Sequence, residues 1–180
     1  MIKKILILTG IITVSIIAMN SLRVMSNTDG APSGQTGSPT DNSSCASSCH
    51  KGPAKANPGM IKSNIPASGY VGGQTYSITA TVTGAAASKK FGFEVSPQNT
   101  AGKLMGKLTV KNATETKLVG NGKYITHKTA GVNGTGNKSW TFDWQAPAKG
   151  SGALTFYGAF LVGGKPETVY TSSLAVKESK

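Results

Sequence analysis

Two cysteines and a histidine lie close together in the sequence: Cys45, Cys49 and His50. Cys-x-x-Cys-His is typical of covalent haem attachment, in which both thiols add to haem vinyl groups and the histidine becomes an axial iron ligand. Here a spacer of three residues, Ala-Ser-Ser, separates the cysteines. We expect a local bulge to absorb the extra residue, because the spacer side chains are small. The motif predicts one haem c, with thioethers to Cys45 and Cys49 and with His50 bound to iron.

The iron would need a ligand on its other side. His127 is the second histidine of the sequence and lies in Tyr124–Lys128, a segment with strand character. We predict it as the second axial ligand, with Met60 and Met105 as the alternatives. Two imidazoles leave no open iron position, so the pattern favours an electron carrier over a catalyst.

Two other interpretations of these residues remain open. A local Cys45–Cys49 disulfide is common chemistry in an exported chain and would suit a non-catalytic structural or adhesive surface protein. Two cysteines and two histidines can also hold zinc, although His127 lies far from the others in sequence. We find no carboxylate pair and no Ser/His/Asp arrangement, so the sequence does not predict an enzyme.

The N-terminal residues have the pattern of an export signal. Lys3 and Lys4 precede an apolar run over residues 5–18, which is shorter than the roughly 20 residues of a comfortable membrane span. We therefore predict a signal peptide over 1–26, with an uncleaved anchor as the alternative. The protein should reach the periplasm or the cell surface.

The chain is basic, with a formal net charge of +12. Its one arginine, Arg23, lies in the signal region and its lysines are scattered, which argues against nucleic-acid binding. The charge suits association with an anionic cell surface. We expect redox proteins as partners, not identified by the sequence, and no feature indicates self-assembly.

Two further regions follow the signal. Residues 27–58 are rich in Gly, Pro, Ser, Asn and Asp, and we expect an irregular leader without strands or long helices that a cofactor could organise. Residues 59–177 alternate apolar and polar positions between turn signals, as in Tyr76–Thr83. Trp140, Phe142 and Trp144 share one strand face, and we expect them to lie in the core or in the wall of the haem site. This pattern predicts an all-β, antiparallel sandwich of seven to nine strands.

The order of motifs resembles a known family. The matching segments are Gly30–Pro39, Cys45 to His50, Phe91–Phe93, Tyr124–His127, Ser139–Pro147 and Gly152–Phe160. They are similar to secreted bacterial proteins with a Reelin-N-terminal-like (Reeler-like) domain, often called choice-of-anchor V proteins. The resemblance implies an immunoglobulin-like sandwich preceded by a haem-type Cys/Cys/His motif, with His127 as the partner ligand. Relatives often end in a C-terminal sorting module, which we do not expect after Lys180.

Overall fold

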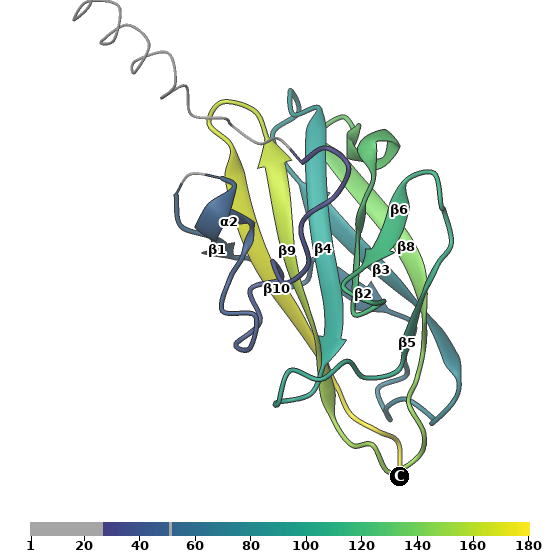
Figure 1. Cartoon of the computed structure of the whole chain (residues 1–180). Coiled ribbons are helices and arrows are strands. Elements are labelled where there is room, and N and C mark those ends of the chain that lie inside the picture. Colours follow the sequence, from purple (N-terminus) through teal and green to yellow (C-terminus); the bar gives the residue numbers. More distant parts are fainter. Residues whose placement is uncertain (1–26, 51) are drawn as a thin grey trace, which may run out of the picture.

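The computed structural model describes residues 27–50 and 52–180 (Figure 1). The predicted signal peptide, 1–26, lies outside these residues. The described chain forms ten strands in two sheets and very little helix, which confirms the predicted all-β sandwich. In this part of the chain, no helix is long and apolar enough to cross a membrane.

One sheet has six strands and carries the candidate site. Its spatial order is β1 (Lys55–Ala56), β10 (Thr168–Val176), β9 (Leu154–Gly163), β4 (Lys90–Gln98), β7 (Tyr124–His127) and β6 (Thr116–Val119). The neighbouring strands are antiparallel, except that β1 pairs with β10 in parallel. Strand β4 thus lies at the centre, between β9 and β7.

The second sheet has four strands, in the order β2 (Ile61–Ser63), β3 (Thr75–Thr83), β8 (Asn137–Gln145) and β5 (Lys107–Val110). In β3 the side chains alternate strictly between buried and more exposed, as the period of two predicts. The short strands β1, β2 and β6, of two to four residues, were not predicted from the sequence.

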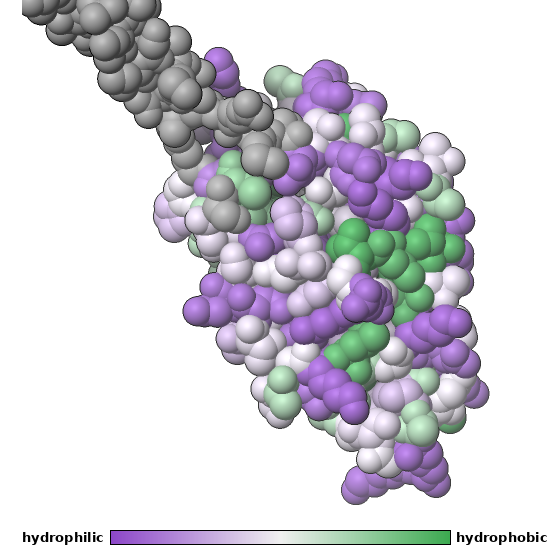
Figure 2. Space-filling view, viewed as in Figure 1, coloured by the Kyte–Doolittle hydropathy of each residue, from purple (hydrophilic) through white to green (hydrophobic). Residues whose placement is uncertain are grey.

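The core lies between the sheets, and the face seen in Figure 2 is mostly hydrophilic. The indole ring of Trp140 stacks on Phe93 with ring centroids 4.4 Å apart, and that of Trp144 meets Phe156 edge-on at 5.1 Å. Each indole N–H donates to a main-chain carbonyl, of Gly131 for Trp140 and of Met105 for Trp144. Both tryptophans therefore belong to the core. They do not line the candidate site.

The leader covers one face of the six-stranded sheet, where it crosses β4 (Figure 1). Strand β4 is consequently buried on both faces, including the polar side chains of Glu94, Ser96 and Gln98. The expectation that the leader lacks strands is wrong at β1, a two-residue strand that pairs with β10.

Polar side chains dock the leader on the sheet. The carboxylate of Asp41, whose side chain is 3% exposed, accepts hydrogen bonds from Tyr124 Oη at 2.7 Å and from Thr36 Oγ1 at 2.5 Å. Thr40 Oγ1 donates to Gln98 Oε1 at 2.9 Å. These contacts hold the leader against the six-stranded sheet.

Candidate functional site

The Cys/Cys/His motif folds as a single helical turn, α2 (Cys45–Ser48). Ser44 is the N-cap, and its side chain accepts the amide N–H of Ala46. Ser47 Oγ accepts the amide N–H of Ser44 at 3.0 Å, which completes a capping box. Residues four apart share one side of a helix, so the turn directs Cys45 and Cys49 the same way.

The end of α2 absorbs the extra spacer residue. The carbonyl oxygen of Cys45 accepts the N–H of Cys49 and also that of His50, the latter at 3.0 Å. The bond to His50 spans one residue more than an α-helical bond, so the last turn is widened. The local distortion expected from the sequence thus takes the form of one widened helical turn, which contains the three-residue spacer.

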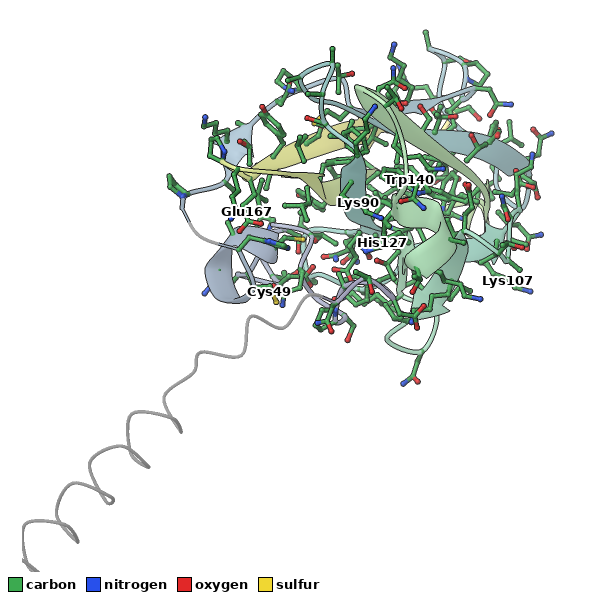
Figure 3. All side chains as sticks on the ribbon, turned by 90° about the horizontal axis from the view of Figure 1, so that it is seen from above. Cys49, Lys90, Lys107, His127, Trp140 and Glu167 are labelled. Atoms are coloured by element: carbon green, nitrogen blue, oxygen red, sulfur yellow. The ribbon has the colours of Figure 1, made fainter. Side chains whose placement is uncertain are left out.

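A cavity of about 270 Å³ brings the predicted haem residues together. It lies between the leader, α2 and the ends of β4, β7 and β9, and Cys45, Cys49, His50 and His127 all line it. Its other walls are mainly apolar and include Pro32, Phe91, Phe93, Val132 and Leu161. In Figure 3, His127 and Lys90 lie toward the middle of the molecule, whereas Cys49 and Glu167 lie on the α2 side.

The two cysteines have different surroundings. Cys45 is buried in a small apolar cluster with Ala159 and Val169, on strands β9 and β10. Burial, reinforced by the nearby Glu94 carboxylate, raises the pKa of the Cys45 thiol to about 12. Cys49 is half-buried at the cavity wall. In the described residues no disulfide joins the two sulfur atoms.

His50 is oriented by a carboxylate. Its Nδ1 lies 2.9 Å from Oε2 of Glu167, a residue of the β9–β10 connection that also lines the cavity. The side chains of His50 and Glu167 are 21% and 35% exposed. This contact ties His50, two residues beyond α2, to the β9–β10 connection.

His127 is buried at the end of β7 beside β4. Its Nδ1 lies 3.1 Å from the amide nitrogen and 3.2 Å from the carbonyl oxygen of Phe93, and the main chain of Asn27 also bonds to the ring. Burial lowers the pKa of His127 and outweighs these hydrogen bonds, so its imidazole is neutral near pH 7. On its own this arrangement is also that of a buried histidine satisfied by the main chain.

The two methionines do not lie at the cavity. Met60 and Met105 are 6% and 8% exposed and pack in the core between the sheets. Neither lines the cavity, because they belong to the interior of the sandwich. The structure therefore groups His127, rather than Met60 or Met105, with the Cys/Cys/His motif.

The described residues contain no group of side chains that could bind a metal ion by themselves. Among residues 27–50 and 52–180, no three His, Cys, Asp or Glu side chains converge closely enough to hold a metal ion. Tetrahedral zinc needs three or four such ligands, so the zinc interpretation finds no support. A haem iron takes four ligands from its porphyrin and would require only two from the chain.

Sequence reasoning missed two residues of this site. No motif in the sequence around Glu167 indicated a role for this residue. Tertiary folding alone brings its carboxylate to His50. Gly92 did carry a signal, since a glycine inside a strand often marks a close approach. A β-carbon on Gly92 would lie 2.9 Å from Cε1 of His127, so the absence of a side chain there makes room for the imidazole.

Comparison with known proteins shows the fold. No protein-family model matches the sequence, and no curated protein matches it either. The human F-spondin reeler domain superposes with a TM-score of 0.54 at 17% identity, over 71% of this chain and 94% of that one. The Reelin-N domain of F-spondin gives 0.56 at 17% identity, over 72% and 94%. The described part of this chain therefore has a β-sandwich similar to reeler domains.

Proposed function

We propose that this protein is an exported monohaem c-type cytochrome that transfers electrons. The observation that carries the proposal is the cavity itself, which gathers Cys45, Cys49, His50 and His127 from two segments far apart in sequence. Two thiols and two imidazoles around apolar walls are the donor set that a covalently held haem requires. A buried structural histidine alone gives no reason for both cysteines to face the same cavity.

The residues present fit such a group. Cys45 and Cys49 both line the cavity, as attachment of both thiols to one porphyrin would require. The cavity has a volume of about 270 Å³, close to the lower end of the range of about 300–1,000 Å³ for small-molecule pockets. His127 can bind iron only if Asn27, whose main chain bonds to the ring, gives way.

Each side chain has a role in this proposal. Cys45 and Cys49 would hold the haem through thioethers, and His50 and His127 would bind its iron. The bound haem supplies reversible one-electron chemistry at iron. Phe91 and Phe93 wall the cavity and exclude water, and burial keeps His127 neutral, the form that binds a metal.

A second candidate is a non-catalytic structural or adhesive surface sandwich. The fold likeness favours this candidate over the first, because both reeler structures are similar to the chain over more than two thirds of its length. Under this reading Cys45 and Cys49 form a local disulfide in the oxidising exterior. The residues of the cavity favour the cytochrome. The two candidates can be told apart by visible absorbance, because only a protein that holds haem is red.

Localisation and partners belong to the same proposal. The basic pair and apolar run of residues 1–26 support export to the periplasm or cell surface. The excess of lysine over acidic residues supports attraction to anionic surfaces and to acidic redox partner proteins.

Expression with a cytochrome c maturation system tests the proposal. We expect a red protein whose haem stays bound on denaturing gels and gives a c-type pyridine haemochrome spectrum. His127→Ala should shift the Soret and visible bands. The controls Met60→Leu and Met105→Leu should leave them unchanged, because both lie in the core. A colourless product with a Cys45–Cys49 disulfide would refute the cytochrome and leave the structural candidate.

A further inference from the structure

We infer that Glu167 is the positioning residue for His50: its carboxylate holds the imidazole in the tautomer whose Nε2 is free to bind iron. The haem part of this inference rests on the proposed function, whereas the tautomer belongs to the protein alone. Glu167 takes no direct part in the chemistry and would act through His50.

The hydrogen bond determines where the proton of His50 lies. The distance from Nδ1 of His50 to Oε2 of Glu167 is 2.9 Å, within the range of a charge-assisted hydrogen bond. An ionised carboxylate can only accept, so Nδ1 must carry the hydrogen. In the neutral imidazole the lone pair then lies on Nε2.

The second histidine of the cavity is held differently. Nδ1 of His127 lies near both the amide nitrogen and the carbonyl oxygen of Phe93, so these contacts do not assign its proton to one ring nitrogen. Histidines that bind metals through Nε2 usually have Nδ1 held by a carboxylate or a backbone carbonyl, and His50 has a carboxylate there. The cavity thus presents one imidazole oriented by the main chain and one oriented by a carboxylate.

The carboxylate also has an electronic effect. A negatively charged acceptor on Nδ1 makes the imidazole a stronger electron donor, which stabilises ferric over ferrous iron. Glu167 should therefore lower the reduction potential. A mere surface ion pair between Glu167 and His50 would contribute little to stability and would not influence the tautomer or the potential.

The tautomer can be measured without haem. Long-range ¹H–¹⁵N NMR of the haem-free protein at pH 8 should show His50 protonated on Nδ1. In Glu167→Ala the proton should move to Nε2, the site that an imidazole without this acceptor prefers. Glu115→Ala is the matched control, because Glu115 is a similarly exposed carboxylate paired with Lys138 at 2.8 Å and does not line the cavity. An Nε2-protonated His50 in the unaltered protein would overturn the inference.

The haem-loaded protein provides the second measurement. Glu167→Gln should keep full haem content and an unchanged melting temperature, while its reduction potential rises and its ferric EPR g-values shift. Glu115→Gln should change none of these. Normal haem content with an unaltered potential and EPR spectrum in Glu167→Gln would overturn the inference and leave the cytochrome standing. If the unaltered protein takes up no haem, the cytochrome and the potential effect both fail, and the NMR result alone decides the tautomer.

Discussion

Gly92 of β4 and His127 of β7 approach so closely that Gly92 cannot carry a side chain without displacing the imidazole. A β-carbon there would lie 2.9 Å from Cε1 of His127, and the main chain of Phe93 holds the adjacent ring atom, Nδ1. The ring is buried, so it has little space into which to move. The position of His127 therefore depends on a glycine in the neighbouring strand.

Gly92→Ala should destabilise the protein by about 1–3 kcal/mol, the usual cost of forcing an extra carbon into a packed site. The same substitution in a His127→Ala background should cost clearly less, because the obstructing ring is gone. Urea unfolding of the two single variants and the double variant measures the coupling. Equal costs in both backgrounds would show that Gly92 and His127 do not interact.

Asp41→Asn should loosen the leader. Burial alone would raise the pKa of Asp41, but hydrogen bonds from Thr36, Tyr124 and Ser38 outweigh it and hold the pKa below its ordinary value. The ionised carboxylate therefore stabilises the fold above its unfolded pKa of about 3.9, and this contribution disappears as the pH falls through the lower folded pKa.

At pH 7 we expect Asp41→Asn to lose about 1–3 kcal/mol in urea unfolding, as for other hydrogen bonds to buried charged groups. The variant should also lose less stability than the unaltered protein when the pH falls below 4. Asp29→Asn is a suitable control, because the exposed carboxylate of Asp29 pairs with Lys117 at the surface and should matter little. A neutral effect of Asp41→Asn would contradict the docking role.

Glu94→Gln should stabilise the protein at alkaline pH. Burial raises the pKa of Glu94 to about 8, with the Asp41 charge adding to the effect. Between the unfolded pKa of about 4.3 and the folded one, the folded state holds a proton that the unfolded state has released. Stability due to Glu94 is thus lost as the pH rises through this window, and the loss levels off above pH 8.

The glutamine variant does not titrate, so its advantage over the unaltered protein should grow from pH 5 to pH 9. We expect about 1–3 kcal/mol at pH 9, the cost of a buried polar group without full hydrogen bonding. Among the described contacts, Glu94 Oε1 indeed has no partner. Parallel pH profiles of the two proteins in urea unfolding would disprove the raised pKa.

Alkylation should distinguish the two thiols in haem-free, reduced protein. With a pKa of about 12, Cys45 is almost entirely thiol at pH 8, and it is also buried, so iodoacetamide should modify it more than about tenfold more slowly than Cys49. Each of the variants Cys45→Ser and Cys49→Ser retains a single cysteine, so mass spectrometry measures the alkylation rate of that cysteine alone. Both rates should become equal in urea. Faster reaction at Cys45 in the folded protein would contradict its burial.

Local patterns in the sequence determined the secondary structure and the donor types of the site. Alternation in β3 and β8 predicts strands because every second side chain of a strand faces the core. The motif from Cys45 to His50 is likewise local, and it predicts the residues for covalent haem attachment. The sequence predicts a local bulge at the spacer but not its form, because the form depends on which carbonyl accepts the N–H of His50.

Only the tertiary structure decided which distant residues meet. Strand register and the path of the leader bring His127 to the same cavity as Cys49, take Met105 into the core, and place Glu167 against His50. These contacts join segments far apart in sequence, so no local period encodes them. They follow from how the two sheets, α2 and the leader bury their surfaces together.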